Sequence, residues 1–247
     1  MPRPLRPSTP RHGLARVLSK RGLCSRTEAA RWIQAGRVSV GGRIVRDPEF
    51  PTAATAVIVI DDLAPAVVER LYIALNKPRG LVTTTLDERG RDTVYRCFDG
   101  SGLPWLAPVG RLDKASEGLL LFCNDPQWSA RISEAHTGTD KTYHAQVDAI
   151  PSPELLASLR SGLDVGGVFL RAKSARLLRA GSRNAWLEII LDEGRNRQIR
   201  RLLAALDINV LRLVRVAIGT LPLGDLPKGQ WRRLDENEVR ALVPVDA

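Results

Sequence analysis

Residues that commonly carry redox and metal chemistry are scarce in this chain of 247 residues. Its three cysteines, Cys24, Cys97 and Cys123, stand apart from one another without a CxxC pair, and its three histidines are equally scattered. An odd number of isolated cysteines indicates a reducing compartment and favours neither a disulfide framework nor a zinc site. We therefore expect no bound metal and no cofactor.

Patterns for nucleotide binding and membrane insertion are missing as well. The chain has no glycine-rich phosphate loop, no Walker lysine, no dinucleotide fingerprint and no nucleophile elbow. No apolar run is long enough to span a bilayer. The opening residues, MPRPLRPSTPRH, are basic and rich in proline, and they lack the apolar segment of a secretory signal. The sequence thus predicts a cytoplasmic protein without membrane contact, in which residues 1–12 form a disordered basic arm.

Positive charge is what the chain has in excess. Its formal net charge is +10, and residues 1–50 alone carry eleven lysines and arginines against three acidic residues. Such an imbalance favours a nucleic-acid partner over a merely solvated basic surface. The hydrophobic content of 44% is ordinary for a globular protein. The length allows one large domain, or a small domain followed by a medium one.

Two short helices and a hairpin are predicted in the first quarter of the chain. Leu14–Gly22 has apolar residues on one helical face, and Ser25 begins a second helix in a capping box with Glu28. Val38–Val45 alternates around two adjacent glycines, which is typical of a hairpin, and Thr55–Ile60 is a further strand candidate. The basic side chains that could line one face of this unit are Arg16, Lys20, Arg21, Arg26 and Arg37.

The rest of the chain mixes strands and helices without a regular βαβ repeat, which favours an α+β domain with a largely antiparallel sheet. We expect a linker at residues 61–70 and this second domain at residues 71–247. The expected strands cover residues 71–75, 118–123, 141–147, 169–178, 185–191 and 208–216. The expected helices cover residues 126–134, 153–159 and 235–242, whereas residues 93–98 are compatible with either a helix or a strand.

One carboxylate stands out in the second domain. Asp113 follows Arg111 in the loop-like segment 108–118, immediately before the apolar run 119–122. A carboxylate between a basic neighbour and a packed strand has its rotamer and its charge state controlled by its surroundings, as catalysis requires. On local sequence alone, however, the better interpretation is a turn in which Asp113 accepts a backbone N–H.

A second unusual feature is the basic segment 193–201, which leads into an apolar helix. It carries four arginines within seven residues, although a helix N-terminus favours acidic side chains. A sequence that accepts this penalty has a use for the positive charge, such as a phosphate or a buried carboxylate. A solvated basic face is an equally good interpretation of the spacing alone.

Residues 13–60 resemble the S4 RNA-binding module. The resemblance is carried by the leucine-rich first helix, by Cys24-Ser25-Arg26 at the start of the second, and by Gly36–Val40 at the entry to the hairpin. The module usually has Val-Asn-Gly at the turn, where this chain has Val40-Gly41-Gly42, a change that the turn tolerates. The resemblance implies that the helix pair grips structured RNA through phosphate contacts.

Several blocks of the second domain, taken together, resemble the ribosomal RNA pseudouridine synthases of the RsuA/RluB/RluE/RluF family. These blocks are Leu75–Pro78, Gly110–Asp113, Ser116–Leu120, Lys141–Tyr143, Glu193–Arg201 and Leu211–Arg215. With the S4 module the resemblance spans about residues 13 to 235. Ser116–Gly118 and Glu193–Arg201 are closest to the E-type enzyme of the large subunit, which typically lacks an S4 module. The B-, F- and small-subunit types carry one, so the target uridine stays open.

The resemblance implies a reaction and a set of site residues. Pseudouridine formation breaks a C–N glycosidic bond, rotates the uracil and rejoins it through carbon, without redox or energy input. Asp113 matches the catalytic aspartate, Tyr143 the tyrosine that stacks on the target base, and Arg200 the basic residue that forms an ion pair with the aspartate. Such an arginine would keep a buried carboxylate ionised. The substrate-binding residues implied are Arg111, which helps hold the flipped-out nucleotide, and Arg195, Arg197 and Gln198.

We therefore expect a monomeric pseudouridine synthase acting on ribosomal RNA, free or in an assembling subunit, with the large-subunit (23S) RNA favoured. Whether Asp113 attacks the ribose or removes one of its protons stays open. The alternatives are the small-subunit (16S) RNA as substrate, or a non-catalytic RNA-binding protein of ribosome assembly. A glycoside hydrolase would need a second carboxylate near Asp113, for which Glu117 and Asp125 are candidates.

Overall fold

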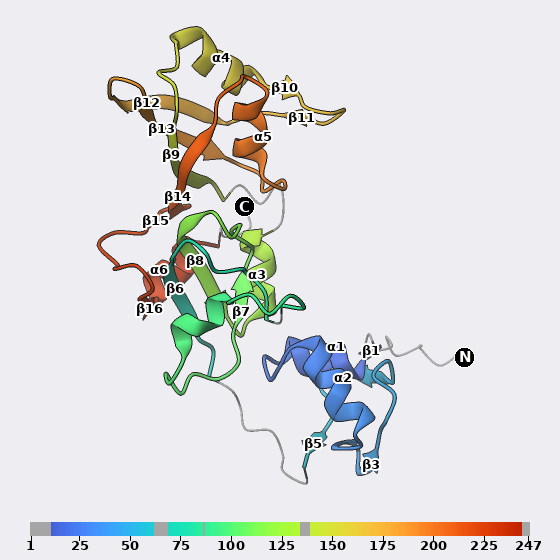
Figure 1. Ribbon diagram of the computed structural model, residues 1–247. Helices are drawn as coiled ribbons and strands as arrows, with labels where there is room; N and C mark the ends of the chain where they lie inside the picture. The colour runs from blue at the N-terminus through green and yellow to red at the C-terminus, as the bar shows by residue number, and fades with distance from the viewer. Residues whose placement is uncertain (1–10, 62–68, 86, 134–138, 244–247) are drawn as a thin grey trace, which may run out of the picture. The chain divides into compact units, whose positions relative to one another are not determined.

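The computed structural model describes residues 11–61, 69–85, 87–133 and 139–243 (Figure 1). The chain divides into two compact units, the first containing the described residues up to 71 together with residues 103–107 and 124–127. The expected linker lies mostly outside the described residues, as does the expected arm up to residue 10. Within the described ranges, no helix has the length and apolarity needed to cross a membrane.

The first unit contains the expected helix pair, α1 (Leu14–Lys20) and α2 (Arg26–Gln34). Their apolar faces pack together because leucine, valine and isoleucine recur at helical spacing, which gives a small core of its own. The hydroxyl of Ser25 accepts the N–H of Glu28 at 3.1 Å, as a cap should. The carboxylate of Glu28 pairs with Arg31 at 3.5 Å.

A three-stranded sheet in the order β3-β2-β5 completes this unit. Its strands are β2 (Val38–Val40), β3 (Arg43–Ile44) and β5 (Ile58–Ile60). The glycines at 41 and 42 adopt φ values of 57° and 80°, which a two-residue hairpin turn requires. A further pairing joins β1 (Arg11–Gly13) to β4 (Pro51–Ala53). The first two residues of β1 were expected in the disordered arm, and this strand pairing orders them instead.

The second unit is built on a sheet in the order β12-β13-β9-β14-β8-β6-β16. These strands are β6 (Tyr72–Lys77), β8 (Glu117–Cys123), β9 (Lys141–Val147), β12 (Ser174–Ala180), β13 (Ala185–Leu191), β14 (Val210–Ile218) and β16 (Trp231–Arg233). Neighbouring strands run antiparallel, except that β8 and β14 are parallel. The predicted α+β class with a largely antiparallel sheet is therefore confirmed.

Short strands and helices surround this sheet. The strands are β7 (Ala107–Val109), beside β8, β15 (Leu221–Pro222), beside β14, and the pair β10 (Leu163–Asp164) and β11 (Phe169–Leu170). The helices are the 3₁₀ helix η1 (Val94–Phe98), α3 (Pro126–Ser133), α4 (Pro153–Ser161), α5 (Gln198–Ala204) and α6 (Glu236–Ala241). The ambiguous segment 93–98 is thus helical, and Asp235 caps α6 in a full capping box.

Two hydrophobic cores position the functional residues. One lies where α4 and α5 cover the alternating apolar face of β9 and β13, as Figure 1 also shows. The other surrounds β6 and β8 and includes Trp128 and Ile132 of α3. Every residue of β8 is buried. Its apolar run 119–122 suits a central strand, whereas Glu117 at its start is buried with two basic partners. The loop that carries Asp113 leads directly into this strand.

Candidate active site

The backbone of the Asp113 loop is held from two sides. Lys77 at the end of β6 is fully buried, and its Nζ donates to the carbonyls of Pro78, Asp113 and Ser116 at 3.0, 3.2 and 2.8 Å. The hydroxyl of Thr83 donates to the carbonyl of the residue before Asp113 at 2.7 Å and accepts its N–H at 3.3 Å. These contacts fix where the Asp113 side chain starts, so its carboxylate is preorganised.

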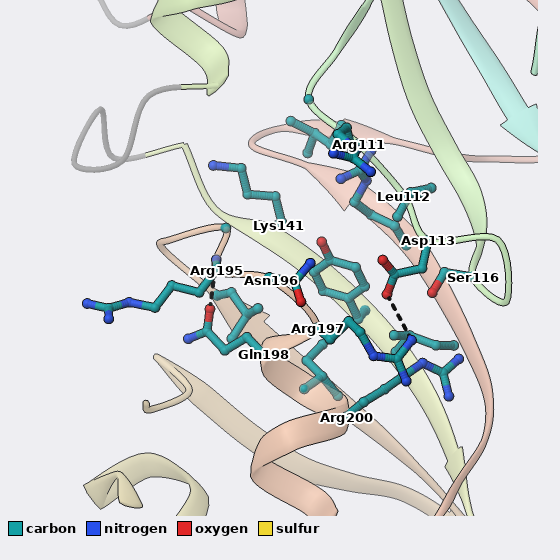
Figure 2. Close-up of a pocket in the computed structure, with 18 of the residues that line it drawn as sticks. Arg111, Leu112, Asp113, Ser116, Lys141, Arg195, Asn196, Arg197, Gln198 and Arg200 are labelled. Atoms are coloured by element: carbon teal, nitrogen blue, oxygen red, sulfur yellow. Dashed lines mark hydrogen bonds and ion pairs between the residues drawn. The ribbon is translucent and has the colours of Figure 1, made fainter. Parts of the chain in front are cut away.

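The carboxylate of Asp113 points toward the guanidinium of Arg197 (Figure 2). Arg197 Nη1 lies 3.7 Å from Asp113 Oδ2, and the Asp113 side chain is 34% exposed. Arg197 is the N-cap of α5 and adopts the left-handed conformation, with φ 50° and ψ 32°. Because that conformation is unfavourable for residues other than glycine, it marks a place where the surrounding structure imposes the geometry.

Arg200, expected to form the ion pair with Asp113, makes different contacts. Its guanidinium donates to the carbonyls of Ala115 at 3.3 Å and Val210 at 3.1 Å, while its buried Nε has no hydrogen-bond partner among the residues that the structure describes. Burial and the charge of Arg197 lower the pKa of Arg200, and the charge of Asp113 opposes them. The direct contact to Asp113 is thus made by Arg197, and Arg200 lies close enough for the charge of Asp113 to act on its pKa.

Gln198, expected to bind substrate, forms its hydrogen bonds with other groups of the protein. It is 2% exposed, its amide group donates to the carbonyl of Arg171 at 2.9 Å and to Glu193 at 2.7 Å, and its oxygen accepts the N–H of Arg195 at 3.3 Å. The Arg195 side chain pairs with the same Glu193 at 2.8 Å. The placement of Gln198 supports a positioning role, in which its bonds hold the basic loop before α5.

These segments enclose one pocket of about 400 Å³, a volume typical of ligand sites. Tyr143 of β9 lines it, and so does the exposed Arg111. Among the described residues that line the pocket, six are basic and only Asp113 is acidic. The basic ones are Arg111, Lys141, Arg195, Arg197, Arg200 and Arg215. This balance indicates a strongly anionic ligand.

Neither the second-carboxylate hypothesis nor a metal site is supported by the described residues. Glu117 is 3% exposed and does not line the pocket; it binds Arg212 at 2.5 Å and Lys228 at 2.6 Å instead. Asp125 is also absent from the pocket lining. The described part of the chain holds no group of three or more potential metal ligands. Among the described lining residues, a single carboxylate among basic side chains is therefore what the site offers to a substrate.

Comparison with known proteins identifies the family. Residues 71–205 match the family model described as RNA pseudouridylate synthase, and residues 13–57 match that of the S4 domain. The chain belongs to the RNA pseudouridine synthase family. It is an enzyme that acts on RNA, and the two resemblances found in the sequence are confirmed.

Relatives match this synthase over nearly its whole length. The ribosomal large subunit pseudouridine synthase B of Bacillus subtilis is 32% identical over 93% of this chain and 94% of its own. An uncharacterized RNA pseudouridine synthase of Rickettsia bellii is 35% identical over 90% of this chain and 96% of its own. A crystal structure of a pseudouridylate synthase, 30% identical, aligns with 95% of this chain and 100% of its own, at a TM-score of 0.66.

The basic residues expected to bind RNA in the S4 domain of the synthase divide into two groups. Arg21 donates to the carbonyls of Ala54 at 2.8 Å and Ala56 at 2.5 Å, and Arg37 binds Asp61 through two nitrogens. Both arginines thus make contacts within the domain. The expected RNA-binding side chains that are exposed without a protein carboxylate partner among the described residues are Arg16, Lys20 and Arg26.

Sequence reasoning gave no role to two residues of the synthase that the structure places at the site. Lys77 is one, and Arg215, which is 5% exposed and lines the pocket, is the other. Both stand in blocks that resemble the family, but a lysine after an apolar run normally reads as the solvated end of a strand. Only the fold shows that Lys77 turns inward onto the loop of Asp113.

Proposed function

We propose that this synthase converts a specific uridine of large-subunit (23S) ribosomal RNA to pseudouridine, with Asp113 as the catalytic carboxylate. The single observation that carries the proposal is a pocket whose described lining residues include one carboxylate and six basic side chains. The charge of the pocket suits the RNA backbone, and its one acid suits a reaction that needs a single ionised carboxylate at the ribose. The name of the Bacillus subtilis relative supports the large subunit.

Each side chain of the site has a role in this proposal. Arg197 contacts the carboxylate of Asp113 and Arg200 interacts with its charge, so that the two guanidinium groups orient the carboxylate in the pocket. Tyr143 stacks on the everted uracil, which offsets part of the cost of about a few kcal/mol for leaving the RNA stack. Arg111 holds the flipped-out nucleotide from the exposed side of the pocket.

The domain organisation proposed from the sequence goes with this function. Residues 13–60 form the RNA-binding S4 domain, residues 61–70 a linker, and residues 71–247 the catalytic domain of a monomeric cytoplasmic enzyme. Arg16, Lys20 and Arg26 supply phosphate contacts that position the RNA without reading its sequence. The substrate is ribosomal RNA, free or in an assembling subunit.

Mapping pseudouridines in the ribosomal RNA of cells with and without this protein tests the proposal. We expect one or a few 23S positions to lose the modification on deletion, to regain it with the wild-type chain, and to stay unmodified with Asp113→Asn. A lost position in 16S RNA would move the target to the small subunit. Unchanged maps would favour the non-catalytic alternative.

A further inference from the structure

One buried basic side chain of the pocket has no part in the proposed mechanism so far. Arg215 of β14 is 5% exposed and lines the pocket. Its Nε donates to the carbonyl of Leu119 at 2.7 Å, but its Nη2 is buried and has no hydrogen-bond partner in the part of the chain that the structure describes. A buried charged donor without an acceptor is unfavourable, so its retention calls for an explanation.

A second cation stands close to Arg215. Lys141 and Tyr143 project from the same face of β9, because alternate residues of a strand share a face, and Tyr143 pairs in register with Arg215. Burial and the charge of Arg215 lower the pKa of Lys141, and the charges of Asp140 and Asp192 oppose them only in part. The neighbouring carboxylate of Asp140 forms its hydrogen bonds with Lys173, at 2.8 and 2.9 Å. Within the described residues, Lys141 itself has neither a hydrogen bond nor an ion pair.

Neither cation therefore has an acid as a hydrogen-bond or ion-pair partner among the described residues, although the charges of Asp140 and Asp192 act on Lys141 from a distance. The carboxylate of Asp113 is engaged with Arg197, and the other described residues of the pocket offer no acid. A ligand with oxygen atoms would supply the missing hydrogen-bond acceptors, and in RNA these oxygens belong to either a phosphate or a uracil ring. The position of Arg215, buried and beside the proposed stacking residue Tyr143, favours the base, because phosphates of the RNA chain stay nearer to solvent.

We propose that Arg215, with Lys141, binds the carbonyl oxygens of the target uracil and stabilises the negative charge that the ring gains during isomerisation; this rests on the proposed function. When the C1′–N1 bond breaks, its electron pair stays on the uracil, shared by N1, O2 and O4. After rotation, C5 supplies the electron pair of the new C5–C1′ bond. The C5 proton is then lost and N1 gains a proton, so that substrate and product are isomers.

Measuring the rate of isomerisation and the affinity for RNA separately tests this role. The variants are Arg215→Met, Arg215→Lys and Lys141→Met, with Arg179→Met as a control that removes an exposed arginine of β12 outside the pocket. The substrates are 23S and 16S transcripts tritiated at C5 of uridine. Tritium release is followed with enzyme in excess, and the Kd for the same RNA by filter binding.

We expect Arg215→Met to slow the single-turnover rate by about 100-fold, as for the loss of one donor to a developing anion. The Kd should change less than about threefold, because the base contributes little of the binding to a polyanion. Arg215→Lys should recover part of the rate, and Arg179→Met should change neither quantity. A normal rate would overturn the proposal, and so would a weakened Kd at normal rate, which would indicate a phosphate contact.

Thermal unfolding distinguishes this role from a structural one. Arg215→Met loses the hydrogen bond from Nε to the carbonyl of Leu119, but it also removes a buried charge whose Nη2 has no partner among the described residues, so its Tm should fall by less than about 10 °C. If Arg215→Met unfolds at a much lower temperature, Lys141→Met decides, because that side chain makes no hydrogen bond or ion pair with any described residue. An unchanged rate for Lys141→Met then overturns the proposal. A wild-type chain that releases no tritium refutes the proposed function itself. If the wild type and Arg215→Met both release tritium at the same rate while Asp113→Asn does not, only this inference is refuted.

Discussion

Replacing Lys77 by methionine measures how strongly the catalytic loop is held. The Lys77 side chain is fully buried, and its ammonium group donates three hydrogen bonds to backbone carbonyls, including those of Asp113 and Ser116. Methionine has a similar length and no donor. The substitution therefore removes three hydrogen bonds and one buried charge while the packing around the side chain changes little.

The size of the effect follows from two opposing contributions. A hydrogen bond from a charged group contributes about 1.5–3 kcal/mol, so three contribute about 5–9 kcal/mol. Burial lowers the pKa of Lys77 from 10.5 to about 8. Keeping the ammonium charged at neutral pH therefore costs about 3 kcal/mol. We expect Lys77→Met to lower the free energy of unfolding at pH 7 by about 2–6 kcal/mol.

The effect should also depend on pH. Between about pH 8 and 10.5 the folded chain has released the Lys77 proton while the unfolded chain still holds it, so raising the pH favours the folded wild type. The stability difference from Lys77→Met should thus grow over this range and be constant below it. Urea unfolding at several pH values measures it, with the exposed Lys114→Met as the control. A variant as stable as the wild type, or a difference that shrinks above pH 8, would refute the reasoning.

Three further substitutions probe other parts of the site. Arg197→Gly should raise the free energy of unfolding by up to about 1 kcal/mol, because glycine suits its left-handed backbone, while tritium release falls with the loss of the contact to Asp113. Gly118→Ala should destabilise the fold by more than about 3 kcal/mol, because its φ is 101° and a Cβ would clash with the backbone of Arg215, which circular dichroism on heating would detect. Glu117→Gln should cost about 3 kcal/mol at pH 7 in urea unfolding. Burial raises the pKa of Glu117, but the hydrogen bonds from its two basic partners outweigh this and lower it below 4.5, so its contribution is present above pH 4.5 and lost as the pH falls further. A fully active Arg197→Gly, a normal Tm for Gly118→Ala or a pH-independent loss for Glu117→Gln would each contradict the structure.

Local patterns predicted much of the fold because they act over few residues. The Ser25 cap depends on a hydroxyl three residues before a backbone N–H, and the Gly41-Gly42 turn on two positions with positive φ. The alternation of side chains over residues 141–147 predicted a strand whose first and last residues are those of β9. The apolar run 119–122 indicated a buried strand, which the structure has as the middle of β8.

The contacts within the site were harder to predict, because they depend on how distant segments meet. The spacing of the basic segment before α5 does not reveal that Arg197 adopts a left-handed backbone, so it could not decide which arginine contacts Asp113. In the same way, nothing in the sequence around Gln198 shows that its side chain is buried. The structure shows this, because the Gln198 amide group donates a hydrogen bond to the carbonyl of Arg171. The parallel pairing of β8 with β14 also depends on a long crossover that no local pattern encodes.

The most direct test of the account is tritium release from ribosomal RNA labelled at C5 of uridine, with purified wild-type protein and the Asp113→Asn variant. The account predicts release by the wild type and a loss of at least about 1,000-fold in the variant, while both bind the RNA with similar Kd. Because asparagine has nearly the same shape as aspartate, such a loss isolates the ionised carboxylate. Release by Asp113→Asn at the wild-type rate would contradict the account.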